Sequence, residues 1–343
     1  MSAAEADHPS DQYPANRFPA SRTPARSGLR AAVFAVAAAL IGLEALWAGV
    51  DWPRSVSDTP ALRAYYLHGA EESGPNAVAL LGASRMRQGF DTRVFYERYP
   101  DRPLFHLANG PSVAVLERLA DAGFSGTVLY SFRSDYATDR AVAASEEELE
   151  SLLSHGSFER LAGRATAWRQ WSVRALQYRL GWSGLIEQIL RQRGLPRLPA
   201  SVVRQDRFNP VDRVRQASYG ELKSAAPPLG PDRTPDRSGL SADRLRHLER
   251  VRTAVTAVQA RGGRVVFIRF PTDDDHLLWD DLNQPRDLHW DRFADLTGAV
   301  TIHFQDVPGL SGFECPDDSH LDRRDAPLFT AALLDELELR GVL

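Results

Sequence analysis

Cysteine is almost absent from this chain, because Cys315 is the single cysteine among 343 residues. One cysteine excludes an internal disulfide and a four-cysteine zinc site. A strong charge of either sign is absent too: the formal net charge is −4, which argues against nucleic acid as a partner. With 43% hydrophobic residues, the chain still holds enough apolar side chains for a substantial core.

Long apolar runs are scarce as well, and the exception is Ala31–Val50. A helix of this length, at about 1.5 Å per residue, matches a bilayer core of about 30 Å. The run has no polar face and a single charge, Glu44, near its end. Trp47 and Trp52 would lie in the interfacial aromatic belt. We therefore predict a transmembrane anchor over residues 29–50, with a buried amphipathic helix as the alternative.

The flanks of this run predict its orientation. Residues 1–28 are rich in Ala, Ser, Pro and charge, so we expect a disordered tail. Arginines precede the run at Arg17, Arg22, Arg26 and Arg30, whereas only Arg54 follows it closely. The positive-inside tendency leaves the tail in the cytoplasm and places residues 51–343 outside the inner membrane. A cleaved signal peptide is the alternative, but no clear small-x-small cleavage site follows the run.

Beyond the anchor, short β-like runs alternate with helical patterns. Strands are predicted at 77–81, 103–107, 126–132, 264–270 and 300–304, and helices at 59–70, 91–99, 113–122, 241–261 and 324–339. This alternation predicts one α/β domain with a flavodoxin-like, doubly wound parallel sheet. An insertion at about 141–240 interrupts it, with long helices over 141–195 and a surface loop over 196–240.

The helical part of the insertion carries an apolar stripe. It is predicted to pack against the core, with a substrate lid as the alternative, and it comprises Trp168, Trp171, Leu176, Leu180, Trp182, Leu185 and Ile189.

The chemistry-bearing stretch follows the first predicted strand, where Gly82 permits a sharp turn before Ser84. Ligands bind outside the carboxyl ends of strands in open parallel sheets, so Ser84 is placed to be a nucleophile. The alternative role for this serine is a helix N-cap. Near the C-terminus, Asp317 and His320 are three positions apart, so in a helical turn the carboxylate can orient the imidazole. Asp318 would point elsewhere.

A serine becomes a nucleophile when a base takes its proton, and the base works best when a carboxylate holds its tautomer. Ser84, His320 and Asp317 supply that set if the fold brings them together. The Gly-x-Ser turn and the Asp-x-x-His pair resemble the motifs of the SGNH (GDSL-type) hydrolase superfamily. The resemblance covers roughly residues 75–340. It points to the membrane-anchored bacterial branch, which includes acetyltransferases and acetylesterases of cell-surface polysaccharides.

The resemblance also implies an oxyanion hole. Related enzymes place a glycine whose N–H stabilises the oxyanion after the second strand, where this chain has Asn109 and Gly110. A plain Asn-Gly turn is the alternative. The Gly-x-Asn-Asp motif that the superfamily carries after its third strand is missing, and Ser131–Asp135 stands there. Arg133 or Ser134 could substitute as the donor. The missing motif is also compatible with a member of the superfamily that has lost its activity.

Acidic residues crowd after the fourth predicted strand, in Asp273–His276, Asp280–Asp281 and Asp287–His289. They lack a fixed ligand spacing, so a solvated acidic loop is predicted in preference to a metal site. Arg269, near the end of that strand, either holds an anionic sugar or pairs with these acids, and we favour the pairing. No cofactor or metal is expected.

Together these features predict a membrane-anchored serine esterase or O-acyltransferase. The resemblance implies an ester of a cell-surface polysaccharide as substrate and a membrane-bound acyltransferase as partner. The competing hypothesis is a catalytically inactive binding or scaffold subunit of a polysaccharide assembly system, which would keep the fold and lose the oxyanion donors.

Overall fold

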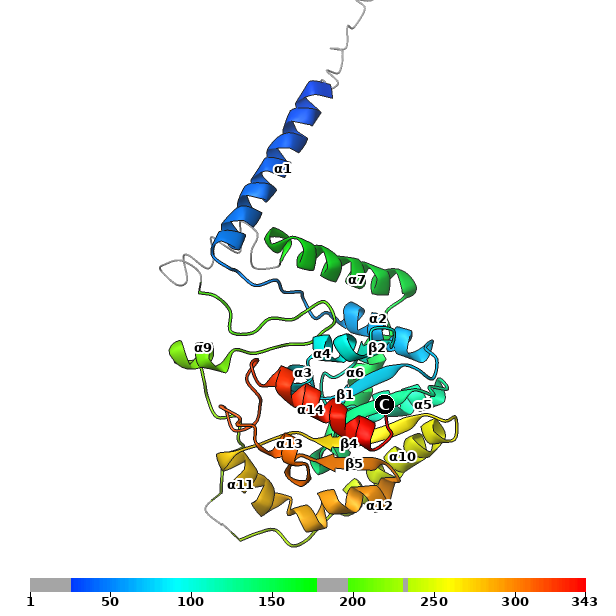
Figure 1. Cartoon of the computed structure of the whole chain (residues 1–343). Coiled ribbons are helices and arrows are strands. Elements are labelled where there is room, and N and C mark those ends of the chain that lie inside the picture. Colours follow the sequence, from blue (N-terminus) through cyan, green and yellow to red (C-terminus); the bar gives the residue numbers. More distant parts are fainter. Residues whose placement is uncertain (1–25, 178–196, 231–233) are drawn as a thin grey trace, which may run out of the picture.

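A sheet of five parallel strands forms the centre of the protein (Figure 1). The computed structural model describes residues 26–177, 197–230 and 234–343. The strands are β1 (Val78–Gly82), β2 (Leu104–His106), β3 (Thr127–Ser131), β4 (Arg264–Arg269) and β5 (Val300–His303), in the order β2-β1-β3-β4-β5. Every pairing is parallel. The predicted parallel sheet is confirmed; β1 is shifted by one residue from its predicted range, and the other four strands are one or two residues shorter than predicted.

Helices cover both faces of this sheet. Side chains alternate along each strand, so Ala79 and Leu81 face one apolar layer while Val78 and Leu80 face the other. The first layer includes α2 (Pro60–Glu71), α5 (Val113–Asp121), α6 (Asp139–Leu153), α10 (Ala242–Gln259) and α12 (Phe293–Thr297). The second includes α3 (Ser84–Gly89), α4 (Thr92–Arg98), α13 (Pro308–Ser311) and α14 (Ala326–Leu339). This strand order with helices on both faces is that of a doubly wound, flavodoxin-like sheet.

The remaining described elements are shorter or lie outside these layers. They are α1 (Arg26–Gly49), α7 (Ser157–Ser172), α9 (Arg213–Ser218), α11 (Asp274–Asn283) and the 3-10 turns η1 (Ser134–Ala137), η2 (Arg174–Leu176), η3 (Arg286–Leu288), η4 (Trp290–Arg292) and η5 (Phe304–Asp306).

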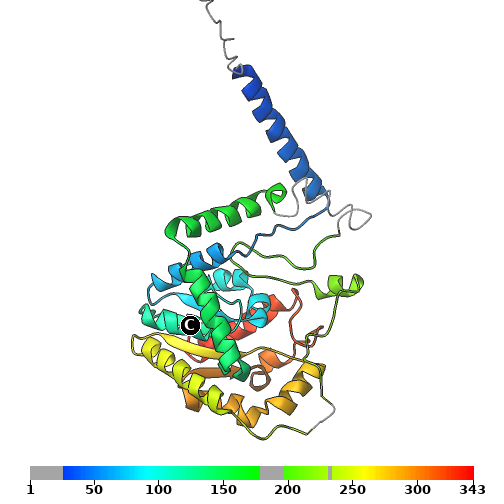
Figure 2. The same ribbon diagram turned by 180° about the vertical axis from the view of Figure 1, so that it is seen from behind.

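Helix α1 extends away from the α/β domain (Figures 1 and 2). Within the described residues, the helical segment Gly28–Gly49 is long enough and apolar enough to cross a membrane. The predicted tail over 1–28 is wrong at its end, because the helix already begins at Arg26, while residues 1–25 lie outside the described part. The end of the helix differs from expectation as well: Trp47 and Trp52 are buried against each other and against Ala175.

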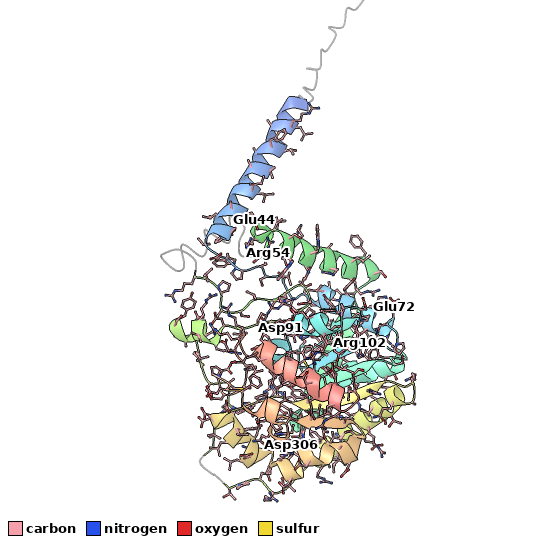
Figure 3. All side chains as sticks on the ribbon, in the orientation of Figure 1. Glu44, Arg54, Glu72, Asp91, Arg102 and Asp306 are labelled. Atoms are coloured by element: carbon pink, nitrogen blue, oxygen red, sulfur yellow. The ribbon has the colours of Figure 1, made fainter. Side chains whose placement is uncertain are left out.

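Polar contacts hold the same end of α1 against the domain. Glu44 lies 2.8 Å from Arg174 and 3.6 Å from Arg54, and Figure 3 shows Glu44 and Arg54 side by side at the base of the helix. Glu44 therefore has two cationic partners supplied by the domain.

The insertion is partly as predicted. Its described N-terminal part is helical, in α6 and α7, as expected. The expected surface loop is wrong in part, because Arg207 and Phe208 are fully buried and α9 forms within it. The expected packing of the apolar stripe is wrong for Trp168, which is 60% exposed. Leu180, Trp182, Leu185 and Ile189 lie outside the described residues.

Candidate active site

Strand β1 ends at a glycine that no other residue could replace without strain. Gly82 has φ +119°, and a Cβ built on it would lie 2.9 Å from both the Cβ and the carbonyl oxygen of Ser131 on β3. The chain can therefore turn sharply beside the neighbouring strand only because this position has no side chain. Helix α3 begins two residues later at Ser84, so the serine lies just beyond the carboxyl end of β1.

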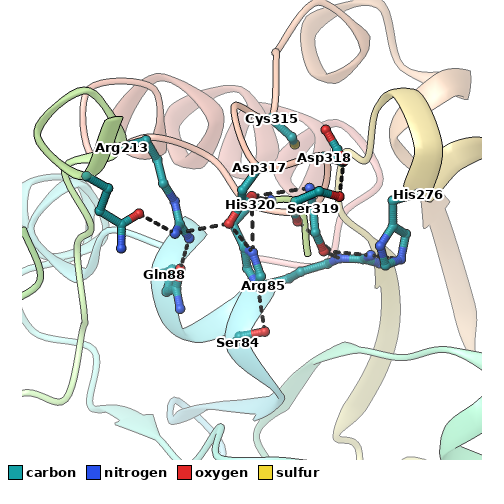
Figure 4. Close-up of polar contacts among 12 residues, drawn as sticks. Ser84, Arg85, Gln88, Arg213, His276, Cys315, Asp317, Asp318, Ser319 and His320 are labelled. Atoms are coloured by element: carbon teal, nitrogen blue, oxygen red, sulfur yellow. Dashed lines mark hydrogen bonds and ion pairs between the residues drawn. The ribbon is translucent and has the colours of Figure 1, made fainter. Parts of the chain in front are cut away.

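The Ser84 hydroxyl contacts the imidazole of His320. Ser84 Oγ lies 2.7 Å from His320 Nε2, and the two residues are 236 positions apart in the chain. The predicted proximity is therefore confirmed. The alternative role of Ser84 as a helix N-cap is not confirmed, because Ala83 occupies the N-cap position of α3 and no side-chain cap bond is present. Figure 4 shows the serine below the imidazole and the carboxylate of Asp317 on its other side.

Asp317 holds the second nitrogen of the same ring. His320 Nδ1 lies 3.0 Å from Asp317 Oδ2. Asp317 Oδ1 also accepts the backbone N–H groups of Ser319 and His320, at 3.3 and 2.8 Å. The Asp317 side chain thus closes a turn by bonding to the backbone, and the segment is not the helical turn that was expected. This turn places the carboxylate beside the ring of His320. With Nδ1–H donating to the carboxylate, Nε2 is left to accept the serine proton.

Arg213 of α9 approaches Asp317 from the insertion. Its Nη1 lies 3.0 Å from Asp317 Oδ2, and both side chains are buried. Burial by itself raises the pKa of Asp317, but the hydrogen bond and charge of His320, together with Arg213, hold that pKa below its usual value. The guanidinium also donates to Gln88 on α3. Arg213 thus connects Asp317 to the helix that carries Ser84.

A second arginine connects the same two segments. Arg85 follows Ser84 and is buried, and its guanidinium donates to the Ser319 carbonyl at 3.2 Å and to the Ser319 hydroxyl at 3.0 Å. Its Nη2 also lies 2.6 Å from Nε2 of His276. Because Ser319 precedes His320, the guanidinium of Arg85 joins the helix of Ser84 to the segment of His320 (Figure 4).

Two arginines contact the same nitrogen of His276. Arg133 Nη1 lies 3.1 Å from the Nε2 atom that Arg85 also contacts. Burial and the charges of Arg133 and Arg269 outweigh the opposing effect of Asp280 and lower the pKa of His276 to about 4. The ring is therefore neutral at pH 7, and its Nε2 serves as an acceptor for both guanidinium groups.

The acidic segment after β4 is solvated as predicted at Asp274, Asp275, Asp281 and Asp287, which are exposed, but it is not a loop throughout. It begins the helix α11, in which His276 and Asp280 are buried. Arg269 makes an ion pair with Asp280, so the favoured pairing of Arg269 with these acids is confirmed. Among the described residues, no group of three or more His, Cys, Asp or Glu side chains is placed to hold a metal ion.

The other predicted oxyanion and substrate residues follow or end the other strands: Asn109 and Gly110 come after β2, Arg133 comes after β3, and Arg269 ends β4. Since β1 lies between β2 and β3, Ser84 lies between the loop of Asn109 and Gly110 and the loop of Arg133. Asn109 and Gly110 line a cavity of about 200 Å³. Arg133 and Arg269 line a second one, of about 50 Å³. Neither cavity is lined by Ser84 or His320.

The loop after β2 is tied to the end of β1. The Ser112 hydroxyl donates to the Gly110 carbonyl at 2.8 Å and accepts the Gly82 N–H at 3.3 Å. Gly110 is thereby fixed close to the strand that presents Ser84.

Comparison with known proteins adds no family to this description. No protein-family model matches the chain, and no curated protein matches it significantly.

Sequence reasoning missed three residues of the site, Arg85, Arg213 and Ser319, and it named His276 only within the acidic segment that was weighed as a metal site. Arg85 and Ser319 adjoin the predicted triad residues, and their adjacency was the available signal. Arg213 carried no such signal, since it lies 104 positions before Asp317 in a segment that was predicted to be a surface loop.

Proposed function

We propose that this protein is a serine hydrolase or O-acyltransferase of the SGNH type that acts on an ester. The observation that carries the proposal is the chain of contacts from Ser84 Oγ to His320 Nε2 and from His320 Nδ1 to Asp317. This order of groups is the one in which a hydroxyl, a general base and an orienting carboxylate cooperate in acyl transfer. The cap alternative needs none of these long-range contacts.

In the proposed reaction, Ser84 Oγ attacks the ester carbonyl carbon while His320 Nε2 takes the serine proton. The carbonyl oxygen becomes an oxyanion, and the tetrahedral intermediate then expels the alcohol, which leaves with the proton from His320. Water or an acceptor hydroxyl next attacks the acyl-serine while His320 takes its proton, and the second tetrahedral intermediate breaks its bond to Ser84 Oγ, which leaves with the proton from His320 as the acid or new ester is released. Asp317 keeps its negative charge throughout and stabilises the imidazolium.

The proposed reaction also needs donors for the oxyanion. Ser84 opens α3, so its own N–H lacks an intrahelical acceptor and is free to serve as one donor. Gly110, beside the end of β1, is the second donor that the resemblance implies. The substitutes for the missing Asn are engaged elsewhere: Arg133 contacts Asp135 and His276, and Ser134 donates to Gln284 at 2.6 Å. This observation favours the alternative of an inactive binding or scaffold subunit.

A fluorophosphonate probe separates these two candidates, because it forms a covalent bond with an activated serine. We expect the full-length protein in detergent to be labelled, Ser84→Ala to be unlabelled and His320→Ala to be labelled far more slowly. Ser154→Ala, at an exposed serine after α6, is the matched control and should be labelled normally. Silence of the wild-type protein would leave the binding subunit as the better proposal.

We further propose that α1 anchors the α/β domain outside the inner membrane. Its length and apolarity support a membrane span, and the arginines before it support the orientation. A reporter enzyme that works only outside the cytoplasm should be active when fused after Leu343, and an active cytoplasmic reporter there would refute the orientation.

The resemblance adds a polysaccharide ester as substrate and a membrane-bound acyltransferase as partner. Mass spectrometry of an oligosaccharide acceptor after incubation with an acyl donor tests for transfer.

A further inference from the structure

Helix α7 has a buried face that packs on the domain. A Cβ built on Gly163 would lie 2.9 Å from the backbone of Ala61 and Leu62 in α2, so the two helices touch closely here. Ala167 and Gln170 on the same side are buried. Gln170 also accepts the Ser57 N–H at 2.8 Å. This face is therefore fully occupied by contacts within the chain.

The opposite face of α7 is apolar and exposed. Phe158, Leu161 and Trp168 are 83%, 61% and 60% exposed, and Ala165 between them is exposed as well. At about 100° per residue these four side chains fall within an arc of about 80°. Three large apolar side chains in one stripe form the kind of exposed patch that marks an interaction site.

The position of α7 shows what can cover this stripe. Figures 1 and 2 place α7 across the end of the domain from which α1 leaves, and it runs across α1 rather than along it. Its C-terminal end is pinned to the base of α1: Arg54 donates to the Trp171 and Ser172 carbonyls at 2.5 Å, and Arg174 contacts Glu44. When α1 crosses a bilayer, α7 lies along the surface of that same bilayer with its exposed stripe directed toward it.

Charge fits the same occupant. Helix α7 carries Arg160, Arg164 and Arg169 against the single acid Glu159. Helices that lie in a membrane interface combine Trp, Phe and Leu on one face with basic residues beside it, which suits anionic headgroups. From these observations we propose that α7 is an interfacial helix whose Phe158–Leu161–Trp168 stripe inserts into the headgroup region of the bilayer that α1 enters.

This proposal rests on the anchor proposed above and goes beyond it, because it fixes how the domain is held against the lipid. The contacts of Glu44 and the buried Trp47–Trp52 pair already fix the base of α1 to the domain. Two attachments, α1 and α7, hold the domain and its Ser84 site in one orientation to the membrane surface.

Nitroxide labels on single cysteines in the full-length protein test this. Cys315 is buried and its thiol pKa is raised by burial, so it should not take the label. In nanodiscs containing anionic lipid, labels at Leu161→Cys and Ala165→Cys should be more accessible to oxygen than to a water-soluble nickel complex. The matched control is Leu328→Cys, an equally exposed apolar position on α14, whose label should show the opposite preference.

A label within the span, at Ala38→Cys, separates the two proposals. If it reports lipid while positions 161 and 165 report water like position 328, the anchor stands and the interfacial helix is refuted. Dipolar broadening between labels at position 165 of different copies would show that a second chain covers the stripe, which also overturns the proposal. If position 38 itself reports water, the anchor fails, and the interfacial helix fails with it.

Discussion

Replacing Asp317 by Asn should remove the proposed activity of Ser84 for one reason and lower the stability of the fold for another. The amide cannot accept the His320 Nδ1 proton with the strength of a carboxylate, and it favours the wrong tautomer across the 3.0 Å contact. In a serine triad this change lowers turnover by about 10⁴-fold, equivalent to about 5 kcal/mol of barrier. Because the pKa of Asp317 is held below its ordinary value of 3.8, the carboxylate is ionised across any practical assay range.

The cost in stability comes from Arg213. Its side chain is 8% exposed and that of Asp317 is 5% exposed, so the substitution leaves a buried guanidinium without this anion. Breaking a buried pair from one side costs about 3–5 kcal/mol. We expect about 3 kcal/mol, because Gln88 and Gln216 still accept from the guanidinium. For a domain of this size that corresponds to a fall in Tm of about 5–10 °C.

A double-mutant cycle separates the two effects. Arg213→Met removes the cation, so Asp317→Asn combined with Arg213→Met should recover about 2 kcal/mol relative to the sum of the single changes. Fluorophosphonate labelling should stay about 10³–10⁴-fold slow in the double variant, because the tautomer is still wrong. Labelling of Asp317→Asn within tenfold of the wild-type rate, while Ser84→Ala stays unlabelled, would refute the orienting role of Asp317.

Three further outcomes are expected. Gly82→Ala should lower the free energy of unfolding in urea by about 1–3 kcal/mol, because φ is +119° and the new methyl group meets Ser131 at 2.9 Å; an unchanged unfolding midpoint would contradict the steric argument. Arg85→Lys keeps the charge and loses the planar fork on Ser319, so Ser84 labelling should slow by about tenfold with little change in Tm; an unchanged rate would show that the fork does not align the site. The pKa values of His106 and His276 are lowered to about 3 and about 4 by burial. As the pH falls below 6.5, these histidines therefore bind protons in the unfolded chain but not in the folded one. The free energy of unfolding should then fall from pH 6.5 toward pH 4. Each histidine should contribute up to about 1.4 kcal/mol per pH unit, His106→Leu should flatten the profile, and urea titrations showing no pH dependence would exclude the effect.

The sequence by itself determined the elements whose signal is local. Five apolar runs separated by helical patterns predicted a parallel sheet, because strands buried on both faces have no polar alternation. The apolarity of α1 was equally evident. The Asp317–His320 contact was also local, because a carboxylate three positions before a histidine reaches its ring through a turn of the chain itself.

The tertiary structure decided what depends on distant partners. The hydroxyl of Ser84 meets a ring 236 positions away, and only the winding of β1 and the return of the chain before α14 bring them together. Arg213 looked like a surface residue because its segment is rich in Pro, Arg and Asp with little periodicity, yet its charge is buried where Asp317 offsets it. Trp168 was predicted to lie in the core because it is apolar. The sequence did not show which side of α7 would face α2, and Trp168 lies on the other side. A local pattern encodes backbone conformation and apolarity, whereas the partner of a buried charge and the cover of an apolar face are set by how separate elements pack.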